Sequence, residues 1–146
     1  QRATAARLPI RALEPYTTVF TLFDSLSEED QLGMIRSALQ MEDQLADYAT
    51  TLSDAYFAED SRRLWEFTRI ESAKAPGYTP ARADAEFARL EAALMTRRNR
   101  EWIAVLEQAA AEGPALAAFG ALHLSGHDGV LALLAARGWA LERLPL

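Results

Sequence analysis

The sequence predicts a mixed α/β fold of the α+β kind, in which a small sheet of about three strands packs under a large helical layer. Two observations support this prediction. Short apolar or alternating segments lie near the two ends of the chain, and residues 16–112 between them carry the apolar spacing of amphipathic helices. We therefore expect a single domain over residues 1–146, with a strand at 8–14, a helical region at 16–112 and a strand–helix–strand region at 115–145.

The first strand is predicted at residues 8–14, where Ile10 and Leu13 alternate loosely with other residues. Pro15 then opens a helix that runs to about residue 26, because proline is well tolerated in the first turn of a helix. This arrangement places Glu14 where the strand ends and the helix begins.

The middle of the chain is predicted to form several helices. Ser27, followed by Asp30, resembles a capping box and starts a long helical stretch. Its apolar stripe consists of Leu32, Ile35, Leu39 and Leu45. A second helix is expected over residues 53–73, and "KAPGYTP" at 74–80 is expected to be a loop.

The next helix should begin at Pro80, with Thr79 as its N-cap, and continue to Gly113–Pro114. After it, "ALAAFGAL" at residues 115–122 favours a buried strand, although its alanines leave a helix open. A short helix is expected at 130–137, closed by a glycine, and "WALERL" at 139–144 alternates as a final strand.

Composition excludes several classes of function. A formal net charge of -6 does not attract nucleic acid, and the cluster of Arg97, Arg98 and Arg100 is too short to form a binding stripe. The chain has no cysteine, so disulfides, zinc–thiolate sites and thiol nucleophiles are excluded. A metal site would have to use histidine and carboxylates. The chain also lacks an apolar run of the roughly 18 residues that a membrane-spanning helix needs.

Both histidines of the chain, His123 and His127, lie around one glycine-containing turn. A histidine just beyond a buried strand lies where α/β proteins usually bind ligands, and Gly120 would allow close approach of a ligand. Glu14 also ends a predicted strand, so its carboxylate could converge with His123. One imidazole and one carboxylate would be about half of a divalent metal site.

Each of these residues also has a purely structural interpretation. His123 could be a hydrogen-bonded structural histidine, and Glu14 a solvated carboxylate favoured by a helix dipole. Arg98 could be an ordinary surface arginine, and His127 is interpreted as an exposed turn residue. The tryptophans are expected to be packing residues: Trp65, Trp102 and Trp139.

Three blocks of the sequence together resemble the C-terminal half of the TraB/GumN family, relatives of the Tiki metalloproteases and, more distantly, of erythromycin esterase. They are "ALEPYTTVFTLFDSLSEEDQ", "TRRNREW" and "FGALHLSGHDGVLALLAARGWALERL". The resemblance covers nearly the whole chain, in order. The last block is the most specific, because it contains a Gly-x-x-His motif from Gly120 to His123 followed by a Gly-Val-Leu helix.

The resemblance implies a site built from two Gly-x-x-His motifs, a glutamate and an Arg-Asn pair. Glu14 matches the family's glutamate, and Arg98 and Asn99 match the Arg-Asn pair, with Trp102 completing that segment. The chain departs from the pattern where Pro15 replaces the usual threonine and Val19 the usual glutamine. The first Gly-x-x-His motif is missing from these residues, which leaves the expected site incomplete.

The function that the resemblance implies is a metal-dependent hydrolase, with peptidases as one candidate class. His123 would bind a divalent ion of the Mn, Co or Zn class, Glu14 would be a ligand or general base, and Arg98 and Asn99 would position substrate. The alternative is a non-catalytic binding or regulatory domain that keeps the fold without a complete site.

The predicted partners follow from the incomplete site and the small sheet. The missing N-terminal half of the domain is expected to supply the remaining ligands. A homodimer through an exposed sheet edge is a further possibility. The resemblance also implies an extracytoplasmic location, because relatives often carry export signals.

Overall fold

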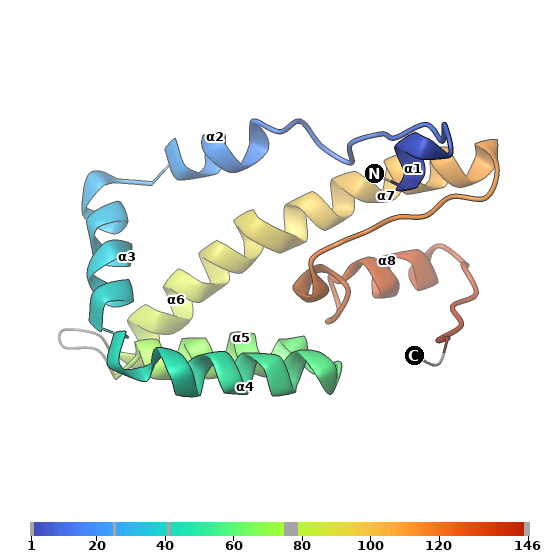
Figure 1. Ribbon diagram of the computed structural model, residues 1–146. Helices are drawn as coiled ribbons and strands as arrows, with labels where there is room; N and C mark the ends of the chain where they lie inside the picture. Colours follow the sequence, from blue (N-terminus) through green and yellow to red (C-terminus); the bar gives the residue numbers. More distant parts are fainter. Residues whose placement is uncertain (1, 25, 41, 75–78, 145–146) are drawn as a thin grey trace.

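The computed structural model describes residues 2–24, 26–40, 42–74 and 79–144. Every regular element in these ranges is a helix or a helical turn (Figure 1). In chain order they are α1 (Arg2–Ala5), α2 (Thr18–Asp24), α3 (Glu28–Gln40), η1 (Glu42–Gln44), α4 (Leu45–Phe57), α5 (Ser61–Ser72), α6 (Pro80–Glu91), η2 (Ala92–Thr96), α7 (Arg97–Glu112), η3 (Ala121–His123) and α8 (Val130–Ala136).

The predicted α/β fold is wrong, because the described residues contain no strand and no sheet. The segments 8–14, 114–120 and 139–144 run as irregular backbone without pairing to one another. Short apolar runs favour extended backbone locally, but a strand exists only where a second strand accepts its hydrogen bonds. Leu116, predicted to be buried, is 99% exposed. The homodimer predicted to form through a sheet edge therefore has no sheet edge available among the described residues.

The helical region contains more breaks than predicted. α2 begins at Thr18, later than the expected start at Pro15. The single helix expected over 53–73 is divided, because the chain turns between α4 and α5. Glu59 has a positive φ of 58°, and the Asp60 side chain caps α5 by accepting a hydrogen bond from the backbone N–H of Arg63 at 3.3 Å.

The long rod formed by α6, η2 and α7 confirms the prediction for residues 80–112 (Figure 1). Thr79 caps it by accepting the backbone N–H of Arg82 at 3.2 Å, and Pro80 occupies the first turn. Gly113 ends it with a φ of 142°. Most of the loop predicted at 74–80 lies outside the described residues.

The core lies where α8 packs against α7. Trp102, Ile103 and Val130 are buried there, and Phe119 and Leu133 pack around them. α8 ends at Ala136 before a glycine with positive φ, which confirms the predicted helix at 130–137 to within one residue. This small core holds α7 against α8 and against the segment that precedes α8.

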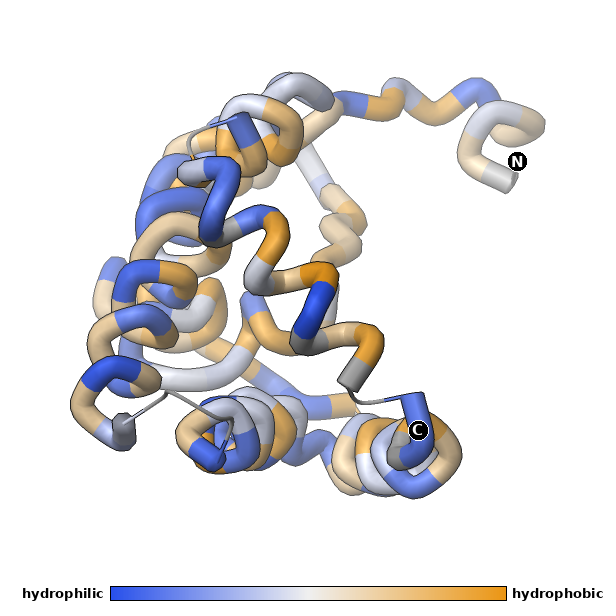
Figure 2. The backbone as a smooth tube through the Cα atoms, turned by 90° about the vertical axis from the view of Figure 1, so that its left-hand side faces the viewer, coloured by the Kyte–Doolittle hydropathy of each residue, from blue (hydrophilic) through white to orange (hydrophobic). Residues whose placement is uncertain are grey.

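Much apolar surface remains outside this core. Figure 2, turned toward the side on which α3 lies in Figure 1, shows apolar and polar residues interleaved along the helices. Trp65 packs edge-on against Phe87 between α5 and α6, with ring centroids 5.2 Å apart, whereas Trp139 is 41% exposed. Within the described ranges, no helix has the length and apolarity that crossing a membrane requires.

Candidate functional site

Five side chains that are distant in sequence meet at the start of α7. Glu14 comes from the segment before α2, whereas Arg98, Asn99 and Trp102 come from the first turns of α7, and His123 ends η3. We call this group the polar cluster. The structure thus brings together the predicted residues Glu14, Arg98, Asn99 and His123, although it does not bring the segments together through a sheet.

Glu14 and Arg98 form a two-point ion pair. The Nε and Nη2 of Arg98 donate to the two carboxylate oxygens of Glu14 at 3.0 and 2.6 Å. Both side chains are mostly buried, with 14% of Arg98 and 19% of Glu14 exposed. The Arg98 hydrogen bonds lower the pKa of Glu14 below its ordinary value, against the opposing effect of burial. The carboxylate is therefore ionised at neutral pH and is a weak base.

Trp102 links the two ends of the polar cluster. Its indole Nε1 donates to Glu14 at 3.1 Å, and its ring lies 4.6 Å from the His123 ring, measured between centroids. The guanidinium carbon of Arg98 lies 5.1 Å from the Trp102 ring centroid. Trp102 is 5% exposed, so the packing role predicted for it is confirmed, whereas its hydrogen bond to Glu14 was not predicted.

Asn99 fixes the orientation of the His123 ring. Its Nδ2 donates to the backbone carbonyl of Asp128 at 2.8 Å, so its Oδ1 faces the Nδ1 of His123 at 2.7 Å. An amide oxygen only accepts, and Nδ1 must therefore carry the proton. The lone pair of the neutral imidazole is consequently on Nε2, the atom that a ligand, metal or substrate proton would meet.

The pKa of His123 is lowered from its ordinary value of 6.5, first by burial and then by the charge of Arg98, while Glu14 opposes the shift. Because folding favours the neutral ring, this contribution to stability is present above pH 6.5 and is lost as the pH falls through the folded-state pKa. Imidazole NMR shifts followed against pH in a His127→Gln variant, which leaves one histidine, should give a midpoint below 6.5. A midpoint above 6.5 would contradict the burial of the neutral ring.

The loop between η3 and α8 is held to α7 through Asp128. Arg100 donates to the Asp128 carboxylate at 2.8 Å, in addition to the Asn99 hydrogen bond to the Asp128 carbonyl. His127 also contacts this carboxylate at 2.8 Å, but 89% of its side chain is exposed. His127 thus lies outside the polar cluster, and Asp128 is a positioning residue that the sequence analysis did not single out.

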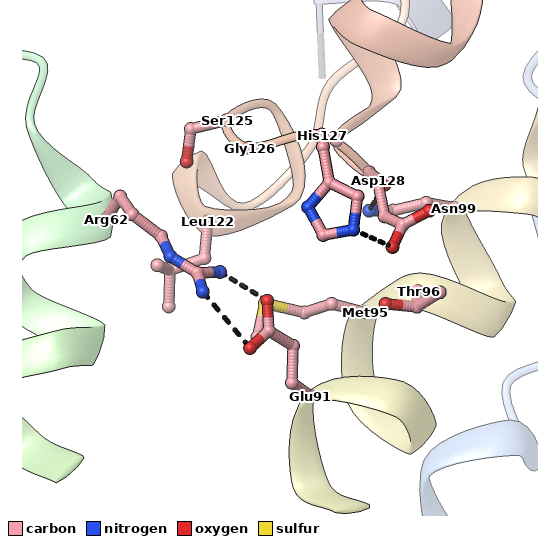
Figure 3. Close-up of a pocket in the computed structure, with 11 residues that line it drawn as sticks. Arg62, Glu91, Met95, Thr96, Asn99, Leu122, Ser125, Gly126, His127 and Asp128 are labelled. Atoms are coloured by element: carbon pink, nitrogen blue, oxygen red, sulfur yellow. Dashed lines mark hydrogen bonds and ion pairs between the residues drawn. The ribbon is translucent and has the colours of Figure 1, made fainter. Parts of the chain in front are cut away.

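A small polar cavity of about 10 Å³ lies beside this loop (Figure 3). Arg62 of α5 pairs with Glu91 of α6 on one side, and His127 and Asp128 lie on the other. The hydroxyl of Ser125 is buried and has no hydrogen-bond partner among the described residues. A cavity of this volume holds about one water molecule. We therefore interpret it as part of the packing that supports the loop.

A larger apolar groove of about 400 Å³ reaches the polar cluster from the side of α4 and α5. Arg98 and His123 of the polar cluster are among its lining residues. Its other lining residues include Leu52, Ala55, Tyr56, Leu64, Trp65, Leu94 and Leu122. A groove of this size with a few polar groups at one end is typical of small-molecule and substrate sites. The groove was not predicted, because its walls come from four separate segments.

The polar cluster does not by itself complete a metal site. Within the described part of the chain, no three His, Cys, Asp or Glu side chains lie together as metal ligands. His123 offers one nitrogen, and three hydrogen bonds already occupy the carboxylate of Glu14. Catalytic zinc-type sites use three protein ligands, so at least one more would have to come from elsewhere.

The described residues thus hold a neutral histidine, a carboxylate and an arginine at one end of an apolar groove. A sequence model of the TraB/PrgY/gumN family matches residues 1–143. The chain therefore belongs to the TraB/PrgY/gumN family, which confirms the resemblance drawn from its motifs. Searches of curated proteins and of solved structures find no match to it. The relation to the Tiki proteases stays a prediction.

Proposed function

We propose that this chain carries part of the active site of a hydrolase, with the Nε2 of His123 as its reactive atom. The observation that supports this most directly is the Asn99–His123 hydrogen bond, which leaves the Nε2 lone pair free to accept a proton or bind an ion. The lowered pKa of His123 keeps the ring neutral at pH 7. Asn99 would thus be a positioning residue that acts through His123.

Arg98 is suited to bind a substrate oxygen at the end of the apolar groove. Two of its N–H groups are engaged by Glu14 and one by the carbonyl of Leu94 at 2.7 Å. A guanidinium has five N–H groups, so about two remain for a carbonyl or developing oxyanion. Glu14 would hold the guanidinium in place, which fits its weak basicity better than a role as general base.

The metal dependence that the family resemblance implies requires ligands from outside the described residues. We propose that the N-terminal half of the domain supplies them, and that His123 is the ligand contributed by this chain. A divalent ion of the Mn, Co or Zn class would there polarise a substrate carbonyl or lower the pKa of a bound water.

The test is calorimetric titration of Mn²⁺, Co²⁺ and Zn²⁺ into residues 1–146 and into a longer polypeptide that includes the N-terminal half, combined with a hydrolysis screen. His123→Ala should lower metal affinity or hydrolysis by about 100-fold or more, because it removes the reactive nitrogen. His127→Ala, which changes the exposed histidine, is the matched control and should have no effect. Equal loss in both variants, or in neither, would contradict the proposal.

A non-catalytic binding domain is the second candidate. Two observations favour this second candidate. Arg98 already occupies Glu14 in an ion pair, and the described residues offer no third metal ligand. In that case the groove would still bind ligand, but metal affinity and hydrolysis would be undetectable in the longer polypeptide and unchanged by His123→Ala.

A further inference from the structure

We propose that the apolar groove binds the uncharged apolar group of a carbonyl substrate, and that Gly120 sets how bulky this group can be beside His123. The substrate class is an uncharged ester or amide that carries an aliphatic or aromatic group next to its carbonyl. This assignment rests on the proposed function, because it names the substrate class of the same site.

The lining of the groove favours an apolar occupant. Leucine side chains line it from three elements, with Leu52 in α4, Leu64 in α5 and Leu94 in η2, and Trp65 lines it as well. Transfer of an aliphatic or aromatic group from water into such surroundings is favourable. The volume of about 400 Å³ also falls within the range that is typical of small-molecule sites. The groove therefore has the size and the lining for the apolar part of a small substrate.

Charge favours an uncharged occupant. Among the described residues that line the groove, none is acidic, and Arg98 is the only one with a permanent charge. An ammonium group would therefore lose hydration without gaining a carboxylate partner from this lining. Glu14 already balances the charge of Arg98 through two hydrogen bonds, so a carboxylate in the groove would gain little net attraction. A carbonyl oxygen needs only a hydrogen-bond donor, which the remaining N–H groups of Arg98 provide.

Gly120 lines the groove together with Arg98 and His123. Its φ of -63° and ψ of 139° are ordinary for any residue, so the backbone does not require a glycine here. Apart from the adjacent residues of the chain, the described residues place one atom within 4 Å of a Cβ built on Gly120, the Cδ2 of His123 at 3.6 Å. Cδ2 is bonded to Nε2, the proposed reactive nitrogen. The missing side chain therefore leaves space beside the reactive edge of the imidazole.

A side chain at position 120 would narrow this space without disturbing the fold. A carbon–carbon distance of 3.6 Å is an ordinary van der Waals contact, so Gly120→Ala should keep the unfolding midpoint of the chain. The added methyl group would nonetheless occupy space that a substrate needs for the group next to its carbonyl. Gly120 is therefore a specificity-determining residue, and it takes no part in proton transfer.

The substrate class is tested with three ligands of equal chain length, hexanamide, hexanoate and hexylamine. Each is titrated at pH 7 into the His127→Gln variant, in which the imidazole NMR signals of His123, the one remaining histidine, report binding. Hexanamide should shift these signals and bind about tenfold or more tightly than either charged ligand. Equal or tighter binding of hexanoate or hexylamine, or no binding of hexanamide, would overturn the proposal.

The role of Gly120 is tested by comparing hexanamide with cyclohexanecarboxamide, which carries a bulkier group next to its carbonyl. Gly120→Ala should weaken binding of cyclohexanecarboxamide about tenfold and that of hexanamide about threefold or less. Gly33→Ala is the matched control and should change neither, because a Cβ there meets no atom within 4 Å. Equal weakening of both amides by Gly120→Ala would indicate a merely structural effect, and it would contradict the role of Gly120, as would unchanged binding of both.

Amide binding is measured without metal ions and without hydrolysis, so this proposal and the proposed function can fail separately. Selective binding of hexanamide, without metal affinity or hydrolysis that depends on His123, would contradict the proposed function and still assign the groove to an uncharged apolar ligand. Metal affinity or hydrolysis that is lost in His123→Ala, without amide binding, would support the proposed function and contradict the assignment of the groove.

Discussion

Gly129→Ala should lower the free energy of unfolding of this chain by about 2–3 kcal/mol, because a side chain cannot fit at this position. A Cβ atom on Gly129 would lie 2.4 Å from the carbonyl oxygen of Ser125 and 2.5 Å from that of Leu124. Both contacts are with backbone, which cannot rotate away as a side chain would. The loop would have to open, and it carries the Asp128 carbonyl that Asn99 binds.

Gly33→Ala is the matched control for this substitution. Gly33 lies inside α3, and a Cβ there would meet no atom within 4 Å. Alanine has a higher helix propensity than glycine, so this variant should be about 0.5–1 kcal/mol more stable. Thermal and urea unfolding followed by circular dichroism would measure both. If Gly129→Ala and Gly33→Ala changed stability in the same direction, the described packing of the loop would be wrong.

Arg98→Leu should be comparably destabilising, by about 2–3 kcal/mol at pH 7. It removes the partner of a mostly buried carboxylate and leaves Glu14 with the Trp102 hydrogen bond. The loss should shrink as the pH falls below 4.5, the ordinary pKa of the carboxyl group. The native ion pair holds the folded-state pKa of Glu14 below 4.5. Its stabilisation is therefore present above pH 4.5 and is lost as the pH falls through the folded-state pKa.

The double variant Glu14→Gln with Arg98→Leu separates the ion pair from simple packing. It leaves no uncompensated charge, so it should recover about 1 kcal/mol or more of the loss caused by Arg98→Leu alone. Urea unfolding at pH 7 and pH 4 would test this. Additive losses from Glu14→Gln and Arg98→Leu, without recovery in the double variant, would show that the two side chains do not depend on each other.

Local signals predicted the helices better than they predicted the sheet. Thr79 and Pro80 marked the start of α6, and Gly113 marked the end of α7, because capping and chain termination depend on a few neighbouring residues. The break between α4 and α5 was missed, since no glycine or proline marks it and the turn relies on a positive φ at Glu59. The prediction of strands was wrong because a strand needs a pairing partner, and a short apolar run does not specify one.

The residues of the candidate site were predicted from the sequence, but some of the contacts among them were not. Glu14, Arg98, Asn99 and His123 were identified by motifs, and they do come together in space. Trp102 was expected only to pack, and its hydrogen bond to Glu14 joins positions 88 residues apart.

The sequence by itself determined the family, the residues of the polar cluster, and the positions where most helices begin and end. Motif spacing and caps are local properties that a single chain carries without its folded context. Only the tertiary structure decided the all-helical fold of the described residues, the tautomer of His123 and the groove beside it. Each of these depends on contacts between segments distant in sequence, and the free energy of such contacts is set by which surfaces meet when the chain folds.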